Sequence, residues 1–202
     1  MRLISVYNKI LAMNTPVFKT EDVSILLNTT NKHGYQLLAK LSAENLIIHL
    51  RRGLWALTAS LDPFILPEYL TAPLPSYISL QSALYFHGMI SQIPSNTYVI
   101  SIARTRIYDT TVGCFSIHHI QPDLFMGFDI VGDNHIKMAQ PEKSLFDFFY
   151  LKATKSKLFY SLPELEIPDN FNWEDIINYA NKITNNSRRT MVLKLAHAYR
   201  AS

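Results

Sequence analysis

Residues Thr20–Leu57 read TEDVSILLNTTNKHGYQLLAKLSAENLIIHLRRGLWAL. Thr20 is a favourable helix N-cap, and the two acidic residues after it suit the positive end of a helix. Apolar residues then recur at helical spacing as far as residue 27, where an Asn/Thr-rich turn begins. A second helix is expected from about Asn31 to Glu44. The stretch therefore predicts two consecutive helices joined by a tight turn.

The second of these helices has one apolar side and one polar side. Gly34, Leu37, Leu38 and Leu41 share the apolar side. The other side carries Asn31, Lys32, His33, Gln36 and Lys40, with Tyr35 at its edge. An ordinary solvated helix face has a similar composition. A helix that reads DNA also needs this division, because polar side chains near its N-terminus contact base edges and phosphates.

Two short strand candidates follow the helices, Leu46–Ile48 and Leu54–Leu57. A glycine after two arginines allows a tight turn between them, and the turn would present Arg51 and Arg52 to a phosphate backbone or a minor groove. Two helices followed by a hairpin of this kind predict a winged helix-turn-helix. Because of this hairpin, we favour a DNA-reading role for the second helix over an ordinary solvated helix face.

This arrangement predicts which residues contact DNA. Those expected to face the major groove are Thr30, Asn31, Lys32, His33, Tyr35, Gln36 and Lys40. Arg51 and Arg52 are expected to reach the flanking backbone or the minor groove, and Lys19 and Thr20 are expected to contact phosphates at the start of the supporting helix.

The charge distribution also indicates DNA binding by the N-terminal part of the chain. The 202 residues have a formal net charge of only +3, but residues 1–58 hold seven Lys and Arg against three acids, a surplus of +4. The remaining residues hold twelve against thirteen, a net of −1. A basic surplus that coincides with a DNA-binding pattern is the expected electrostatic footprint.

Other features narrow the class of protein. The single cysteine, Cys114, excludes an intramolecular disulfide and a cysteine-based zinc site, and it suits a reducing cytoplasm. No signal peptide is recognisable, and no apolar run is long enough to span a membrane. No metal is expected, because His118 and His119 would face opposite sides of a strand and the sequence has neither a His-Glu-x-x-His motif nor a Cys/His cluster at ligand spacing. No other cofactor is expected.

Beyond a proline-rich connector at 59–76, residues 77–202 predict an α+β domain with a small sheet and C-terminal helices. Helices are expected at 79–87, 141–152, 172–182 and 187–199, and strands at 97–103, 114–120, 125–131 and 135–139. In the helix expected at 79–87, the packing face should consist of Ala83, Leu84 and Phe86. The last helix has a possible auxiliary basic surface, Arg188, Arg189 and Lys194, which also suits a solvated face.

A nuclease interpretation rests on Pro122-Asp123 and Glu142-Lys143. The lysine directly follows the glutamate, so on a strand the two side chains would point apart. On a helix, Glu142 is a favourable first-turn charge. We therefore do not expect an enzyme.

Several segments of the second region resemble the AbiEi-type antitoxins, the transcriptional-regulator halves of bacterial type IV, abortive-infection toxin–antitoxin systems. They are Tyr77-Ile78-Ser79, Ala83-Leu84, His87-Gly88, Ile93-Pro94, Phe125-Met126-Gly127 and Ala139 followed by Pro141-Glu142-Lys143-Ser144-Leu145 and Asp147. The winged helix at Thr20–Leu57, ending Arg52-Gly53-Leu54-Trp55-Ala56-Leu57, sits where this family has its DNA-binding domain, so the resemblance covers roughly residues 5 to 155. It implies a repressor that binds inverted repeats in its own promoter and neutralises a separately encoded nucleotidyltransferase-like toxin in phage defence. It supplies no catalytic residues.

Two alternatives remain open at this point. The chain could be a solitary regulator without a toxin partner, or a protein–protein adaptor in which the winged helix is only a scaffold.

Overall fold

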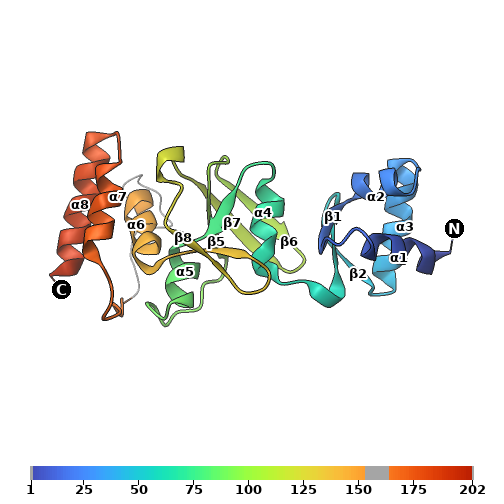
Figure 1. Ribbon diagram of the computed structural model, residues 1–202, viewed down its shortest axis with the longest axis horizontal. Helices are drawn as coiled ribbons and strands as arrows, with labels where there is room; N and C mark the ends of the chain where they lie inside the picture. The colour runs from blue at the N-terminus through green and yellow to red at the C-terminus, as the bar shows by residue number, and fades with distance from the viewer. Residues whose placement is uncertain (1, 153–163, 202) are drawn as a thin grey trace.

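The computed structural model describes residues 2–152 and 164–201. This part of the chain contains eight α-helices and two β-sheets, which confirms the α+β class. In Figure 1 the first helices lie at one end, the larger sheet lies in the middle and the last two helices lie at the other end. No helix within the described ranges is long and apolar enough to cross a membrane.

The N-terminal unit, residues 2–57, packs three helices against a three-stranded sheet. Its elements are α1 (Leu3–Leu11), β1 (Val17–Lys19), α2 (Thr20–Leu26), α3 (Asn31–Ala43), β2 (Ile47–Arg51) and β3 (Leu54–Leu57). Strand β3 lies in the centre of the sheet and is antiparallel to both neighbours. Val6, Ile10, Leu38 and Trp55 belong to one buried cluster between the helices and the sheet.

The expected N-cap of α2 is wrong. The cap position belongs to Lys19, whose backbone N–H donates to Asp22 Oδ2 at 2.8 Å. Thr20 is instead the first helical residue, and its hydroxyl accepts a hydrogen bond from the Trp55 indole N–H at 2.9 Å. The side chain thus ties the start of α2 to the sheet.

The hairpin turn is shorter than the sequence suggests. Strand β2 continues through Arg51, so only Arg52 and Gly53 lie in the turn, and Gly53 has a φ of +78°. A β-bulge between His49 and Arg51 shifts the register. Arg51 is therefore a strand residue and does not lie at the tip.

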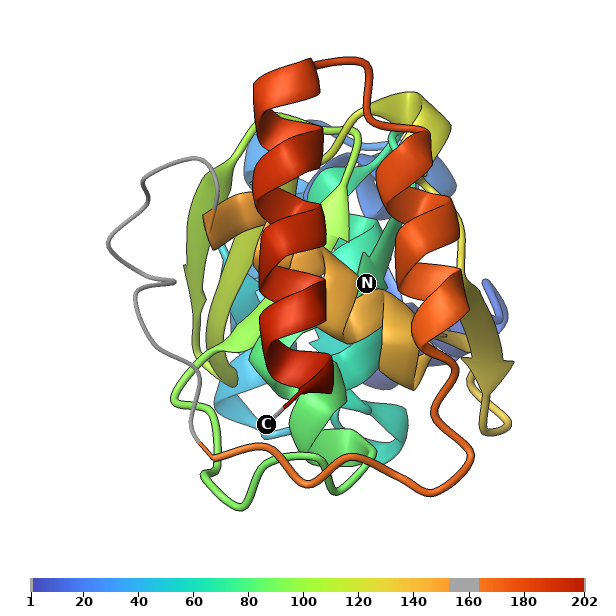
Figure 2. The same ribbon diagram turned by 90° about the vertical axis from the view of Figure 1, so that its left-hand side faces the viewer.

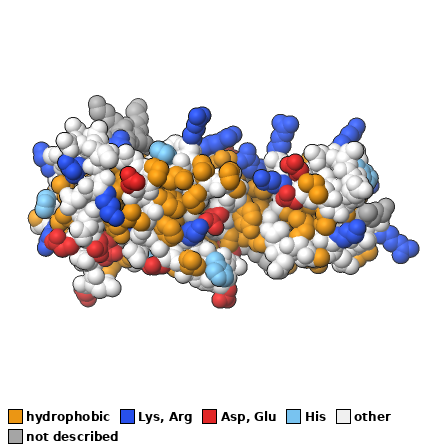
Figure 3. Space-filling model, turned by 45° about the horizontal axis from the view of Figure 1, so that its top comes forward, with side chains coloured by type: hydrophobic (Ala, Val, Ile, Leu, Met, Phe, Trp, Pro, Cys, Tyr) orange, Lys and Arg blue, Asp and Glu red, His pale blue; other side chains and the backbone are white. Residues whose placement is uncertain are grey.

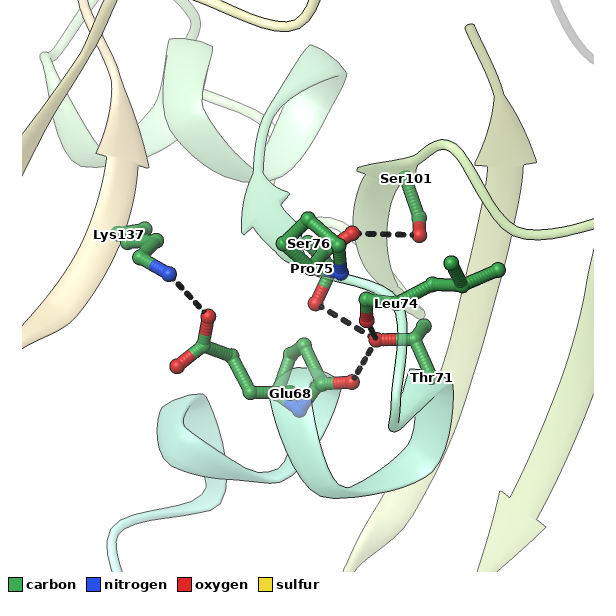
Figure 4. Close-up of polar contacts among 8 residues, drawn as sticks. Glu68, Thr71, Leu74, Pro75, Ser76, Ser101 and Lys137 are labelled. Atoms are coloured by element: carbon green, nitrogen blue, oxygen red, sulfur yellow. Dashed lines mark hydrogen bonds and ion pairs between the residues drawn. The ribbon is translucent and has the colours of Figure 1, made fainter. Parts of the chain in front are cut away.

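The predicted connector contains two 3-10 turns, η1 (Thr58–Ser60) and η2 (Pro63–Ile65), and the short helix α4 (Leu66–Thr71). Figure 4 shows how α4 is attached to the larger sheet. The Thr71 hydroxyl lies 2.8 Å from the Leu74 carbonyl oxygen and 3.2 Å from Ser76 Oγ, and Glu68 forms an ion pair with Lys137.

The larger sheet has six strands in the order β6-β7-β5-β4-β9-β8. They are β4 (Ser76–Ile78), β5 (Thr97–Ser101), β6 (Arg106–Thr110), β7 (Gly113–His119), β8 (Phe128–Val131) and β9 (Ile136–Ala139). The pairs β4/β9 and β5/β7 are parallel and the other pairs are antiparallel. The sequence pattern predicts four of these strands but neither β4 nor β6.

Helices α5 (Leu80–Phe86) and α6 (Pro141–Lys152) share one apolar cluster with the larger sheet. The C-terminal helices α7 (Trp173–Asn181) and α8 (Asn186–Arg200) lie side by side over α6 (Figure 2). One expectation about α5 is wrong, because Phe86 is 51% exposed and does not belong to the packing face. Leu80 is buried with Ala83 and Leu84 instead.

A further apolar cluster joins the N-terminal unit to the larger sheet. Leu50 and Leu54 contribute from the small sheet, Leu66 and Leu70 from α4, and Val99, Phe115 and Ile117 from the large sheet. Leu66 and Leu70 of the connector are therefore buried in the same cluster as residues of both sheets.

Candidate functional site

The start of α3 is fixed by its own sequence and by its apolar side. The Thr30 hydroxyl accepts the His33 backbone N–H at 3.3 Å, which caps the helix. Gly34, Leu38 and Leu41 are buried against the rest of the N-terminal unit. The polar side of α3 is thereby turned toward solvent.

The structure leaves most of the predicted DNA contacts accessible. The exposed ones are Lys19, Thr30, Asn31, Lys32, His33, Tyr35, Gln36, Lys40 and Arg52, whereas Thr20 and Arg51 are partly buried. Tyr35 is 46% exposed. The accessible side chains come from the start of α2, from the polar side of α3 and from the hairpin turn.

A groove of about 950 Å³ brings seven of the predicted residues together; we call it the basic groove. These seven are Lys19, Thr20, Asn31, Lys32, Tyr35, Arg51 and Arg52, and Tyr69, Leu70 and Ala72 close the groove from the side of α4. His33, Gln36 and Lys40 lie outside it and line, with Tyr35, a second hollow along α3. Thr30 lines neither.

The basic groove carries uncompensated positive charge. Among the described residues that line it, Glu21 supplies the one carboxylate. In residues 2–152 and 164–201 the ion pairs join Lys137 to Glu68, Lys143 to Asp147 and Arg200 to Glu174, so Lys19, Lys32, Arg51 and Arg52 take part in none. Four cations without acidic partners attract an anionic ligand.

Tyr35 and His49, which line the groove, form with the buried Trp55 an aromatic group that no sequence motif indicates. The His49 ring lies 4.2 Å from the Trp55 ring, and Tyr35 contacts both rings edge-on. Trp55 also donates to Thr20. Alternation along β2 and β3 could have suggested that His49 and Trp55 share a face, but their pairing depends on the register.

Arg51 contacts the second unit, residues 76–201. Its guanidinium carbon lies 4.7 Å from the centroid of the Tyr108 ring on β6. This cation–π contact limits the freedom of the arginine. No local pattern indicates this contact, since strand β6 itself is not predicted from the sequence.

Two residues of α6, Lys143 and Asp147, form a buried polar group with Tyr77 and Ser79. Lys143 and Asp147 are fully buried and form an ion pair, and Asp147 also accepts hydrogen bonds from Tyr77 Oη at 2.9 Å and Ser79 Oγ at 2.8 Å. Burial lowers the pKa of Lys143 and raises the pKa of Asp147, and each charge opposes the shift of the other. The group joins α6 to β4 and to the start of α5.

In the described part of the chain, no ion pair joins Asp123 to Lys143, the lysine of the nuclease interpretation. Asp123 is exposed in η3 (Pro122–Leu124), whereas Lys143 points into the core. The Glu142 carboxylate accepts the Asn172 backbone N–H at 2.9 Å.

The predicted auxiliary basic residues lie on α8, at the opposite end of the molecule from the basic groove (Figure 1). Arg188 donates to Tyr150 Oη at 2.8 Å and lies over the same ring. Arg189 donates to Asn186 Oδ1, and Lys194 is exposed. The structure therefore does not bring these residues together with the N-terminal candidates.

Comparison with the models of known protein families and with curated proteins finds no match for this chain.

Proposed function

We propose that this chain is a sequence-specific DNA-binding repressor whose winged helix-turn-helix consists of α2, α3 and the β2–β3 hairpin. In this proposal α2 supports α3, α3 enters the major groove, and Arg52 reaches the neighbouring backbone or minor groove. One observation carries the proposal: the polar side of α3 borders a groove with four cations in no described ion pair. A phosphate backbone is the ligand class that such a surface attracts.

Different residues would have different roles on DNA. Asn31 and Gln36 carry amides, which can pair with two atoms of adenine in the major groove. Lys19, Lys32 and Arg52 would contact phosphates and fix the register without reading sequence. Substituting the amides should therefore relax sequence preference, whereas substituting the cations should weaken binding to all sequences.

The proposal is tested with duplex DNA from the region upstream of the coding sequence. Affinity is measured by fluorescence anisotropy between about 50 and 200 mM salt for the intact chain and for Arg51→Ala with Arg52→Ala. We expect the slope of log affinity against log salt to become shallower by about 0.9 for each phosphate that the variant no longer neutralises. Lys182→Ala with Lys194→Ala removes the same charge at the other end of the molecule and should leave the slope unchanged. An unchanged slope in the arginine variant would mean that the hairpin does not contact phosphates.

We extend the proposal, on the resemblance to AbiEi-type antitoxins, to a role as the antitoxin of a type IV system. The test is to examine the neighbouring open reading frame for a nucleotidyltransferase-like protein and to express it with and without this chain. Growth arrest that this chain relieves would support the antitoxin role. Arrest that it does not relieve would leave a solitary regulator.

A second candidate function, a protein–protein adaptor, is favoured by a different surface. Phe64, Tyr85 and Phe86 are 40–51% exposed around a hollow of about 520 Å³. Exposed aromatic side chains of this kind are enriched at protein interfaces. Failure of the intact chain to bind any duplex at low salt would favour the adaptor.

A further inference from the structure

A further hollow, of about 750 Å³, lies between the connector and the β8–β9 hairpin; we call it the connector pocket. Its walls come from the loop before β1, from η2 and α4 of the connector, from β4, and from β9 with the turn that precedes it. Small-molecule sites occur preferentially at such junctions, and this volume lies within their usual range. The connector pocket is therefore large enough for a small ligand, and the proposed DNA contacts do not use it.

Much of the lining of the connector pocket is apolar or aromatic. The lining residues of this kind include Phe64, Ile65, Pro67, Tyr69, Tyr77 and Ile136. In Figure 3 hydrophobic side chains also fill the middle of the molecular face, whereas several Lys and Arg side chains project from its upper edge. A ligand of the connector pocket should therefore carry a large apolar group, because the lining offers apolar surface to bury it.

Two opposite charges lie on different walls of the connector pocket. Glu68 on α4 and Lys137 on β9 form an ion pair (Figure 4). The Glu68 side chain is 46% exposed and the Lys137 side chain 27%, and exposed ion pairs contribute little to stability. A ligand with one ammonium group and one carboxylate group would pair with both residues and replace their contact at a small cost.

The charge balance of the connector pocket disfavours an anionic ligand. Among the described residues that line it, Glu68 and Asp133 supply two carboxylates, and Lys137 is the only lysine or arginine. The basic groove has the opposite balance, with four cations and one carboxylate among its described lining residues. A nucleotide would be attracted to the basic groove, whereas a zwitterion finds a partner for each of its charges in the connector pocket.

The connector pocket and the basic groove share a wall. Tyr69 in α4 and Ala72 directly after it line both hollows. A ligand that separates Glu68 from Lys137 would move α4 away from β9 and toward the basic groove. The space left for DNA beside α3 would then be narrower.

We infer that the connector pocket binds a free amino acid with a large apolar side chain, and that this ligand weakens the binding of DNA. The carboxylate of the ligand pairs with Lys137, its ammonium group pairs with Glu68, and its side chain packs against Phe64, Ile65 and Ile136. The regulatory part of the inference rests on the proposed DNA binding, whereas the binding site itself does not.

The binding site is tested by isothermal titration calorimetry of the intact chain with L-phenylalanine, L-tryptophan, L-leucine and L-methionine. We expect saturable binding of at least one of them. The amine that lacks the carboxylate of the best ligand, and the acid that lacks its ammonium group, should each bind about tenfold more weakly or worse, because each leaves one charged side chain without its partner. The inference is overturned if none of the four amino acids binds, or if either analogue binds as tightly as the amino acid.

Two variants assign the charged contacts. Lys137→Gln should abolish the preference for the amino acid over the amine, and Glu68→Gln should abolish the preference over the acid. Glu174→Gln and Arg200→Gln, which disrupt an exposed ion pair of the C-terminal helices, should keep both preferences. Preferences that survive in both Lys137→Gln and Glu68→Gln would show that the site is wrong.

Circular dichroism of Lys137→Gln and Glu68→Gln should match that of the intact chain, because both side chains are partly exposed. If one variant does not fold, the other variant and the two analogues on the intact chain decide.

The regulatory part is tested by fluorescence anisotropy on the upstream duplex. A saturating concentration of the amino acid should lower the affinity of the intact chain for DNA by about fivefold or more. If the amino acid binds and the DNA affinity stays the same, the regulatory part is wrong and the proposed function stands. If the intact chain binds no duplex at low salt, the proposed function and the regulatory part both fail, while calorimetry still decides the binding site.

Discussion

Lys143 has no exposed surface, yet three elements of the second unit meet at this residue. Its ammonium group pairs with Asp147 and lies 4.7–5.6 Å from the centroids of the Tyr77, Phe146 and Tyr179 rings. Replacing both members of a buried pair by apolar residues is often tolerated, whereas removing one member leaves an uncompensated charge. The pair therefore constrains which substitutions this core accepts.

Removing one member of this pair should be costly. We expect Asp147→Ala to lower the free energy of unfolding by about 3–5 kcal/mol, because the Lys143 ammonium loses its counter-ion in a site without solvent. Lys143→Met with Asp147→Leu should cost less than the single substitution. Urea denaturation measures both values, with the exposed Asp123→Ala as a control. A loss below about 1 kcal/mol for Asp147→Ala would contradict this account.

His118 makes stability depend on pH. Burial lowers its pKa from the usual 6.5 to about 4, and Ser116 Oγ lies 2.9 Å from its Nε2. Between these two pH values the unfolded chain binds more protons than the folded chain, so stability falls as the pH falls from 6.5 toward 4. Over this pH range the free energy of unfolding should fall by about 3 kcal/mol. In urea denaturation at a series of pH values, His118→Gln should remove this pH dependence of stability, whereas His33→Gln should not. If the intact chain and both variants depend on pH in the same way, the prediction is wrong.

Among the helices and strands, the sequence predicts best those elements that are specified by residues close to one another in the chain. The cap at Thr30 and the apolar spacing of α3 specify its face, and Pro141 specifies the start of α6. Strands β1 and β4 have three residues each, too few to show alternation, and β6 is an exposed edge strand. Strands β1 and β4 depend on partners distant in sequence, and the contact between Arg51 and Tyr108 also joins residues far apart in the chain.

The packing of α3 on α2 depends on Gly34. A Cβ at this position would lie 2.2 Å from Ser24 Oγ, and that hydroxyl donates to the Thr20 carbonyl oxygen at 2.8 Å. Gly34→Ala should destabilise the chain by about 1–3 kcal/mol through this overlap. In a Ser24→Ala background the same substitution should stabilise by up to about 1 kcal/mol, because alanine favours helix. Thermal denaturation of the intact chain, of the two single variants and of the double variant measures the coupling between Gly34 and Ser24. Additive effects of the two substitutions on stability would contradict the prediction.

At the scale of the whole molecule, the cluster around Leu50, Leu70 and Phe115 joins both sheets. We expect the N-terminal unit and the second unit to unfold together. The chain has two tryptophans, Trp55 and Trp173, so Trp173→Phe leaves Trp55 as a reporter of the N-terminal unit. In that background, Asp147→Ala should lower the midpoint of the Trp55 fluorescence transition, although Asp147 lies in the second unit.

The control for this prediction is Asp123→Ala, which should leave the Trp55 midpoint unchanged. A Trp55 transition that stays in place while far-ultraviolet circular dichroism reports a separate, earlier transition would show that the two units are independent.

The hydrogen bond from Thr111 to the His49 carbonyl oxygen spans 62 residues of chain. During synthesis on a ribosome, the back of the small sheet therefore stays uncovered until β6 and β7 have left the exit tunnel. At about 5–20 residues per second this interval lasts roughly 3–12 s. Leu50 and Leu54 are exposed to chaperones and to other nascent chains during this interval. An mRNA truncated after the β2–β3 hairpin would yield a protein in which this apolar surface always remains exposed.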